Sequence, residues 1–419
     1  MKILFVAPYV PNLVRVRPYN FIRSLSNRGH QVTLLTPWTN EQDQADIEHL
    51  QPICHHIISA HISQLRSLWN CVQVIPTHKP FQSVFSWLPA LTSLVNPADY
   101  DVVHVEHLRG SRYGLHFKTH TTLPVVWDSV DCITHLFDQA VTQSADFVRR
   151  WRSRMDLART AKYEAWAVNQ FNQVLVTSKV DKGELLHLSH TPDAPISVVP
   201  NGVDLDYFKP DTAVTRQLTT LIVSGKMSYH ANIAMVRHLV HNIMPLVWQQ
   251  RADINLWIVG KDPISEIRSL SAHPHITVTG TVPDLPPYIN QAAIAVAPIT
   301  YNAGIQNKIL EAMACGTPVV TTPQAISALD LVPGKDLLVA DGPKAYAQAI
   351  LELLANPQKS AQVGVNGRRY VEINHNWGHI AQQLETIYRQ SISAQTAVNN
   401  GRQSPIAPLN EQLIQEATN

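Results

Sequence analysis

Cysteine is scarce in this sequence, which has four among 419 residues and no C-x-x-C pair. A disulfide framework or a structural zinc site of the usual spacing is therefore poorly supported, and a reducing cytoplasm is the expected compartment. No apolar run approaches the roughly 20 residues that a membrane-spanning helix needs, and the first residues show no signal-peptide cleavage pattern. These absences predict a cytoplasmic protein whose contact with a membrane, if it has one, is peripheral.

An excess of charge of either sign is also missing. Lys and Arg total 33 and Asp and Glu total 32, which gives a net charge of +1. A surface without a basic field has no general attraction for phosphate backbones, so nucleic acid is not an expected partner.

Three common nucleotide and hydrolase motifs are absent as well. The sequence contains no G-x-G, so the dinucleotide-binding fingerprint is missing, and it contains no G-x-S-x-G nucleophile elbow. Gly225-Lys226 resembles the end of a P-loop, but Met227 stands where Ser or Thr would bind magnesium and Thr220 where the first glycine belongs. A dehydrogenase and a P-loop phosphotransferase are therefore disfavoured.

What the sequence does contain is a regular alternation of strand-like and helix-like segments. In the first half, Ile3–Val6 precedes a helical segment over Tyr19–Arg28 that Gly29 can close, and a second strand follows. Such strand–helix–strand units build parallel sheets, so the predicted fold class is α/β. The other strands expected in this half are Gln31–Thr36, Asp101–Val105, Leu123–Trp127, Gln173–Thr177 and Ile196–Val199, with a long helix over Ala145–Asn169.

The alternation starts again after a turn-rich segment at Pro200–Pro210. The expected strands are Thr220–Ser224, Ile254–Val259, Ile276–Thr279, Ala293–Ala297, Pro318–Thr321 and Leu337–Val339, and the expected helices are 232–249, 308–314, 343–355 and 360–373. Two α/β domains are therefore predicted, over residues 1–200 and 201–376, with a polar tail over 396–419 that we expect to be disordered.

The most informative segment is Ala297–Thr321, APITYNAGIQNKILEAMACGTPVVT. A strand ends near Pro298, Gly304 precedes a helix, and Gly316 ends that helix before the next strand. Free N–H groups at the helix start and the helix dipole form an anion site, to which Lys308 adds a charge. Glu311 lies on the same helix face and can accept bonds from two hydroxyl groups, such as those of a ribose. The alternative is an ordinary surface ion pair between Lys308 and Glu311.

This segment resembles the nucleotide-sugar binding motif of family-4 retaining glycosyltransferases, G-x-x-x-K-x-L-E-A-M-A-x-G-x-P-V-V. Other segments resemble the family in the same order, namely Arg28–Thr33, Val199–Asp204, Ser224–Met227, Ile258–Gly260 and Val278–Gly280. The resemblance covers about residues 1–390 and implies a GT-B fold of two facing Rossmann-like domains. It also implies that the last helix, residues 377–392, crosses back to the first domain.

The resemblance assigns roles to individual residues. It implies that Glu311 holds the ribose and that Lys226 replaces the family's arginine at the β-phosphate, with Gly225 in the same turn. Thr281 and Val282 fall where the family contacts the nucleobase, although a plain loop is an equal alternative. The amides of Gly304, Ile305, Gln306 and Asn307 are expected to hold the diphosphate together with Lys308.

The sequence departs from the family pattern at several positions. Ala303 replaces the first of two glutamates, which often touches the transferred sugar, and Ala231 or Asn232 stands where a second basic phosphate contact is usual. A family Gly-Gly turn is replaced by residues 8–17, in which Arg15 and Arg17 could reach phosphate or an acidic acceptor, or could be solvated loop charges.

Asp128 stands at or near the position of a family histidine. Asp128, or the nearby Asp131, could bind a sugar hydroxyl or assist the acceptor as a catalytic group, or it could cap the following helix. His230 faces the cleft if the resemblance holds, where it could contact the acceptor or phosphate, and is otherwise an ordinary loop residue.

Two metal-like patterns carry less weight. His104 and His107 flank Glu106, but strand alternation places 104 and 106 on one face and 107 on the other. Asp204-Leu205-Asp206 matches a D-x-D metal motif, but its place between the domains favours a turn. We therefore expect no metal.

These features together predict transfer of a hexose from a UDP- or GDP-sugar to a hydroxyl group of a saccharide or lipid-linked acceptor, with retention and without a cofactor. Surface polysaccharide or glycolipid synthesis is the expected setting. A nucleotide-sugar epimerase of the same fold and a non-catalytic nucleotide-sugar-binding protein are the alternatives.

Overall fold

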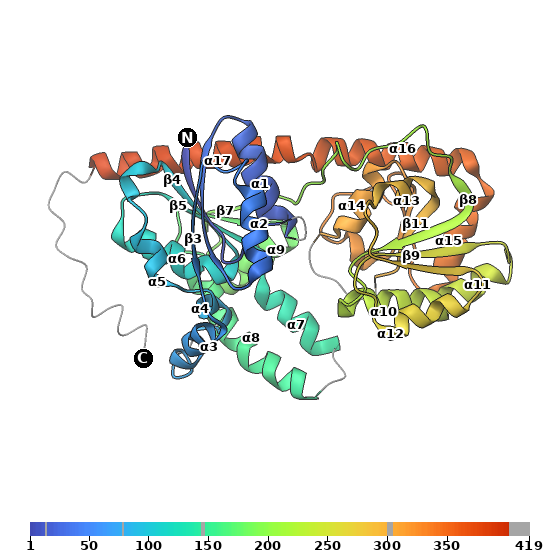
Figure 1. Ribbon diagram of the computed structural model, residues 1–419, viewed down its shortest axis with the longest axis horizontal. Helices are drawn as coiled ribbons and strands as arrows, with labels where there is room; N and C mark the ends of the chain where they lie inside the picture. Colours follow the sequence, from blue (N-terminus) through green and yellow to red (C-terminus); the bar gives the residue numbers. More distant parts are fainter. Residues whose placement is uncertain (13–14, 78, 144–146, 300–304, 402–419) are drawn as a thin grey trace. The chain divides into compact units, whose positions relative to one another are not determined.

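A computed structural model describes residues 1–419 except for residues 13–14, 78, 144–146, 300–304 and 402–419. The chain forms two compact units, Met1–Pro200 with Ile380–Asn419 and Asn201–His379 (Figure 1). Each unit contains a sheet whose paired strands are all parallel, with helices packed against it. The predicted α/β fold class with parallel sheets is confirmed.

The first unit has a seven-stranded sheet in the order β3-β2-β1-β4-β5-β6-β7. The reversal between β1 and β4 is typical of a doubly wound sheet, in which helices cover both faces. For that reason β1 reads as a continuous apolar run with four buried residues. The strands are β1 (Lys2–Val6), β2 (Gln31–Trp38), β3 (His56–His61), β4 (Val102–Glu106), β5 (Val125–Val130), β6 (Gln173–Val176) and β7 (Ile196–Val198).

Side-chain caps start several helices of this unit. Asn40, Ser63 and Ser178 each accept a hydrogen bond from the backbone N–H three residues later, which satisfies an amide that the helix leaves unpaired. The helices are α1 (Val16–Asn27), α2 (Glu41–Leu50), α3 (Gln64–Gln73), α4 (Gln82–Phe85), α5 (Pro89–Ser93), α6 (His107–His120), α7 (Ile133–Gln143), α8 (Phe147–Ala167) and α9 (Lys179–Ser189), with a 3₁₀ turn at Pro97–Asp99.

The second unit has a six-stranded sheet in the order β10-β9-β8-β11-β12-β13. Its strands are β8 (Gln217–Ser224), β9 (Asn255–Val259), β10 (Ile276–Gly280), β11 (Ala292–Ala297), β12 (Val319–Thr321) and β13 (Leu338–Val339). Its helices are α10 (His230–His238), α11 (Met244–Trp248), α12 (Ser265–Ser269), α13 (Pro286–Gln291), α14 (Asn307–Ala314), α15 (Pro343–Ala355) and α16 (Pro357–Asn374), with 3₁₀ turns at Leu270–Ala272 and Pro323–Ile326.

The helix predicted over residues 232–249 is not one regular α-helix. A π-helical turn, Leu239–Ile243, separates α10 from α11. Pro245 stands near the start of α11. It has no N–H to bond to the carbonyl of the preceding turn, which accounts for the interrupted hydrogen-bond ladder.

Helix α17 (Trp377–Gly401) begins in the second unit, and its residues from Ile380 onward belong to the first. The buried Tyr388 hydroxyl lies 2.8 Å from His104 Nδ1 of β4, and Glu385 accepts bonds of 3.0 and 2.8 Å from Arg28. The helix extends beyond the predicted end at residue 392. Residues 396–401, which we expected to be disordered, are therefore helical, and residues 402–419 lie outside the described part.

A glycine allows α16 to approach the turn between α14 and β12. A Cβ atom on Gly364 would lie 2.3 Å from the carbonyl oxygen of Gly316. We predict that Gly364→Ala lowers the free energy of unfolding by about 1–3 kcal/mol, because backbone must move to admit the methyl group. Thermal denaturation measures the change.

Gly183, in helix α9, is the matched control because a Cβ there would meet nothing within 4 Å. Gly183→Ala is expected to be neutral or slightly stabilising, since alanine favours the helix. Equal midpoints for Gly364→Ala and the wild type would contradict the close approach.

Candidate functional site

Three strands of the second sheet end side by side at glycines with positive φ. Gly225 follows β8, Gly260 follows β9, and Gly280 ends β10, with φ angles of 147°, 150° and 70°. A Cβ atom on Gly260 would lie 1.8 Å from the Gly225 carbonyl oxygen, so no other residue fits there. These glycines keep side chains away from the carboxyl edge of the sheet, where open α/β sheets bind ligands.

Lys226 extends from this edge into solvent. Its Nζ lies 3.7 Å from Asp262 Oδ2, and both side chains are more than half exposed. A long, exposed ion pair of this kind contributes little to stability, so Lys226 can exchange Asp262 for an anionic ligand at small cost. Asp262, directly after the β9 turn, has a positive φ of 54°. No sequence motif marks it as a partner of Lys226.

Asn232 connects the two lysines that were predicted to bind phosphate. Its Nδ2 donates to the carbonyl oxygen of Lys226 at 2.9 Å, and its Oδ1 accepts from Lys308 Nζ at 2.7 Å. Helix α10 starts at His230 with Tyr229 as its N-cap residue, so Asn232 lies in the first turn of the helix. Asn232 positions Lys308 beside the Gly225–Lys226 turn.

Lys308 and Glu311 lie in the first two turns of α14, half-buried. Burial lowers the pKa of Lys308 to about 8, and the nearby Glu311 opposes this shift. Burial raises the pKa of Glu311 to about 7, and Lys308 opposes that shift. Paired titratable groups with pKa values moved toward neutrality by burial are typical of functional sites and are unusual for a surface i,i+3 ion pair.

The start of α14 has no side-chain cap and carries a buried polar atom without a partner among the described residues. Gln306 is the N-cap residue but makes no side-chain capping bond, and the buried Oδ1 of Asn307 has no hydrogen-bond partner among the described residues. The amides of Asn307 and Lys308 have no partner within the helix by geometry, whereas that of Ile309 donates to the Gln306 carbonyl oxygen at 3.0 Å. Ile305 lies just before the helix, half-buried. Gly304 and Ala303 lie outside the described residues.

A pocket adjoins the predicted nucleobase position. Thr281 is exposed and forms part of its wall, whereas Val282 is half-buried and packs on the core of the unit. His230 is exposed at the start of α10 and packs edge-on against Tyr229 at 4.5 Å. The pocket lies between the ends of β9 and β10 and is lined by Asp262, Pro263, Arg268, Ser271, Val278, Thr279, Gly280 and Thr281.

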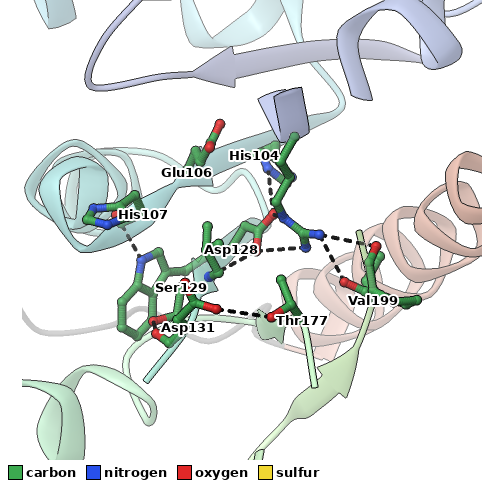
Figure 2. Close-up of polar contacts among 12 residues, drawn as sticks. His104, Glu106, His107, Asp128, Ser129, Asp131, Thr177 and Val199 are labelled. Carbon is green, nitrogen blue, oxygen red and sulfur yellow. Dashed lines mark hydrogen bonds and ion pairs between the residues drawn. The ribbon is translucent and has the colours of Figure 1, made fainter. Parts of the chain in front are cut away.

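In the first unit, the structure buries two residues that the sequence analysis proposed as ligand contacts. Arg17 is 4% exposed, and its Nε and Nη2 bond the two oxygens of Asp128 at 2.7 and 3.0 Å. Arg17 Nη1 also donates to the carbonyl oxygen of Val199 at 3.0 Å, beyond the end of β7. Figure 2 shows Asp128 between His104 and this carbonyl. The pair thus joins helix α1, strand β5 and the chain after β7.

Arg17 is therefore neither a solvated loop charge nor exposed to a ligand. Asp128 is fully buried, and its Oδ1 also accepts from the backbone N–H of Val130 at 3.1 Å. Because the guanidinium of Arg17 occupies both oxygens of this carboxylate, the geometry favours a structural role. Arg15 is exposed and packs over the Tyr9 ring at 4.4 Å, donating to the carbonyl oxygen of Val10.

His104, Glu106 and Asp131 lie around Asp128 (Figure 2), and burial shifts the pKa of each toward its neutral form. Burial lowers the pKa of His104 to about 4 and raises that of Glu106 to about 8. Burial and the nearby Asp181 raise the pKa of Asp131 to about 7. One Glu106 oxygen accepts from Tyr9 at 2.9 Å, and the other has no partner among the described residues.

The residues predicted to be weak metal candidates have other partners. The carboxylate of Asp204 accepts backbone N–H bonds from Asp206 and Tyr207 at 3.2 Å, which forms a turn. His104 stacks on Phe5 with a centroid distance of 4.3 Å. In the part of the chain that the structure describes, no group of three or more His, Cys, Asp or Glu side chains is arranged to hold a metal ion.

The buried pair generates a prediction that separates a structural from a catalytic role for Asp128. Asp128→Asn leaves the Arg17 charge buried without a counter-charge, which costs about 3–5 kcal/mol of folding stability. Chemical denaturation measures this loss. Asp131→Asn is the control, because Asp131 has a pKa of about 7 and accepts a hydrogen bond from Thr177 rather than from a guanidinium. Full stability of Asp128→Asn combined with lost turnover would instead establish a catalytic role.

Comparison with known proteins agrees with this architecture. Residues 14–207 match the family described as Glycosyltransferase Family 4, and residues 219–356 match that described as Glycosyl transferases group 1. The GDP-mannose-dependent alpha-(1-6)-phosphatidylinositol monomannoside mannosyltransferase of Mycolicibacterium smegmatis is 28% identical over 206 residues, which is 44% of this chain and 54% of that protein. The D-inositol 3-phosphate glycosyltransferase of Kineococcus radiotolerans is 24% identical over 56% of this chain and 60% of its own length. The matches thus span a little over half the length of these curated relatives.

Solved structures resemble the whole chain. Sucrose-phosphate synthase from Thermosynechococcus elongatus superposes with a TM-score of 0.70 at 20% identity, covering 94% of this chain and 99% of the other. Anabaena HepE in complex with UDP and glucose gives 0.66 at 16% identity, covering 93% and 100%. At these identities the likeness shows the fold alone. The comparisons give no support to the epimerase alternative. Two glycosyltransferase family matches, one in each half of the chain, and a GT-B fold show that the chain belongs to the glycosyltransferases.

Proposed function

We propose that the protein transfers a hexose from a UDP- or GDP-sugar to a hydroxyl group of a saccharide or lipid-linked acceptor. The observation that carries this proposal is the cluster of Lys226, Asn232, Lys308 and Glu311 at the carboxyl edge of the second sheet. It combines two cations, the start of helix α14 and a carboxylate, which are the groups that a nucleoside diphosphate requires. Among the relatives, the mycobacterial enzyme is GDP-mannose-dependent, and HepE was solved with UDP and glucose.

The chemistry asked of this site is stabilisation of a departing nucleoside diphosphate. Negative charge grows on the β-phosphate as the bond between its oxygen and the anomeric carbon of the sugar breaks. Lys226, Lys308 and the amides at the start of α14 supply fixed positive charge at that place. We propose that these groups make a metal ion unnecessary. Retention of the anomeric configuration is proposed from the family resemblance.

Glu311 is proposed to bind the ribose, and Thr281 and Val282 to contact the base. The ionised carboxylate of Glu311 can accept a hydrogen bond from each of two ribose hydroxyls. We further propose that the protein works in the cytoplasm, at the inner face of a membrane that carries its acceptor, for the synthesis of surface polysaccharide or glycolipid. No helix among the described residues is long and apolar enough to cross a membrane.

Nucleotide binding tests the donor site directly. A saturating nucleoside diphosphate should raise the thermal denaturation midpoint by roughly 5–10 °C, as expected for a ligand near 100 times its Kd. Comparing UDP with GDP identifies the base. Glu311→Ala should abolish the shift because the ribose loses its acceptor.

Glu266→Ala is the matched control for this experiment, because Glu266 is an exposed glutamate of the same unit that pairs with Arg237. It should keep the full shift. The absence of a shift with every nucleoside diphosphate would reject the donor site. A shift without transfer across a panel of acceptors would favour the non-catalytic alternative.

The two neighbouring pKa values predict how donor binding depends on pH. Lys308 is protonated below its pKa of about 8 and loses its charge as the pH rises through that value. Glu311 is ionised above its pKa of about 7 and becomes protonated as the pH falls through that value. Affinity for a UDP- or GDP-sugar should therefore be highest between these values and fall on both sides.

Calorimetric titration with an intact nucleotide-sugar measures this profile, because its diphosphate stays ionised throughout the range. Lys308→Met should remove the alkaline decline and Glu311→Gln the acidic one. A profile that is flat from pH 6 to pH 9 in the wild type would show that neither group contacts the donor.

A further inference from the structure

Helix α3 carries its apolar residues on the outside and its polar residues on the inside. Ser67 is 2% exposed and Asn70 is 1% exposed, and Asn70 Nδ2 donates to the carbonyl oxygens of Val84 at 3.1 Å and Trp87 at 2.9 Å. The exposed face of the helix and the residues that follow it consist of Leu65, Leu68, Trp69, Val72 and Ile75, which are between 50% and 80% exposed. We call these five residues the α3 apolar face.

This arrangement is the reverse of an ordinary surface helix, which buries its apolar stripe. The exposed residues follow the i, i+3, i+4, i+7 spacing of one helix face, so the outward orientation is a property of the whole element. Isolated exposed apolar residues need no explanation, but a contiguous patch on a protein surface marks an interaction site.

The α3 apolar face is held firmly in this orientation. Ser63 caps the start of the helix by accepting from the N–H of Arg66 at 3.2 Å. At the other end, Arg159 of α8 donates to the carbonyl oxygen of Ile75 at 2.9 Å. The two bonds of Asn70 and the bond of Arg159 fix the helix against the rest of the unit at its middle and just beyond its end, whereas the Ser63 cap lies within the helix itself. The helix cannot turn its apolar residues inward without breaking the bonds of Asn70 and Arg159.

Cationic side chains lie around the α3 apolar face, and one acidic neighbour, Asp156 of α8, lies near Cys71 of α3. Residues 49–98, which include α3, α4 and α5, contain no Asp or Glu. Arg66 is exposed on α3 itself. Burial lowers the pKa of Lys79, and the nearby Arg112 lowers it further. Burial likewise lowers the pKa of Arg112, with a smaller lowering from Arg66. Such a group of cations is complementary to an anionic surface.

We propose that the α3 apolar face inserts into the interfacial region of a membrane that contains anionic lipid. The helix would lie in the plane of the interface, with Leu65, Leu68, Trp69 and Val72 among the acyl chains and Arg66 at the headgroups. Tryptophan suits this depth, because its ring is apolar and its N–H can reach the polar layer. The inference deepens the membrane contact in the proposed function, but it stands on the first unit alone and does not depend on donor binding.

A protein partner fits this surface less well. Five side chains on a helix of about three turns present a few hundred Å². A stable protein interface needs about 800 Å² from each partner. A membrane requires no matching surface, and its binding strength follows from the buried apolar area together with attraction to anionic headgroups.

Vesicle flotation of the full chain tests the proposal. Wild-type protein should float with vesicles of phosphatidylcholine and phosphatidylglycerol in a 7:3 ratio, and less with phosphatidylcholine alone. The triple variant Leu65→Ser, Leu68→Ser and Val72→Ser should lose at least tenfold in partitioning. Arg66→Gln should remove part of the preference for the anionic vesicles and weaken its dependence on salt.

The matched control replaces three exposed apolar residues of the second unit, Leu218, Val332 and Val365, with serine. It should float like the wild type. Thermal denaturation with and without a nucleoside diphosphate shows whether each variant is folded and keeps the donor site, so failure of the α3 surface is distinguishable from failure of the proposed function.

Three results would overturn the proposal. One is a wild type that does not float with either vesicle, and another is a folded triple variant that floats as well as the wild type. The third is a wild type that sediments as a dimer when the triple variant is a monomer and that does not float, because a second copy of the chain would then cover the α3 apolar face.

Discussion

Every paired strand of each sheet runs parallel to its neighbours, and this constraint determines where chemistry can occur. In a parallel sheet the strands end at one edge, so the segments that follow β8, β9, β10 and β11 are brought together although they are far apart in sequence. Glycines at the first three of these ends keep the edge open. Lys226, Asp262, Thr281 and Lys308 therefore reach the same region of the second unit from four different connections. The location of the site therefore depends on the common direction of the strands, and the side chains then determine what it can bind.

Much of this could be predicted from the sequence where the signal was local. Three strands of the second unit end at Gly225, Gly260 and Gly280, and the segment from Ala297 to Thr321 carries the pattern of a helix preceded and followed by strands. Lys308 and Glu311 were identified because helix spacing places them on one face. Strand β3 and helices α2 to α5 were not identified, because residues 41–98 mix histidine, proline and single apolar residues without a clear period. The apolar side of α3 faces outward because the bonds of Asn70 hold its polar side inward. The spacing of apolar residues shows that a helix has an apolar side, but not whether that side is buried in its own domain.

The buried polar residues were the least predictable part. Arg17 and Asp128 are 111 residues apart and look like independent loop charges in the sequence. Their pairing depends on how α1 approaches the end of β5, which is a tertiary event. The same holds for Asn232, whose two bonds connect residues before and far after it. Burial also reverses expectations about charge, because His104 and Glu106 are neutral at physiological pH where a reader of the sequence would assign a charge or a metal to them. The charge state of such buried groups depends on their tertiary contacts, which the sequence does not show.

Helix α17 adds a constraint on biosynthesis. Its residues from Ile380 onward belong to the first unit, whose remaining residues are synthesised before Asn201. In this helix, the Tyr388 hydroxyl forms a hydrogen bond with His104, and the carboxylate of Glu385 accepts hydrogen bonds from Arg28. Domains usually fold in order as they leave the ribosome. Here the second unit can finish folding while the first still lacks its last helix, so the amino-terminal half must wait, with His104 and the adjoining surface uncovered, until residues 380–401 have been synthesised.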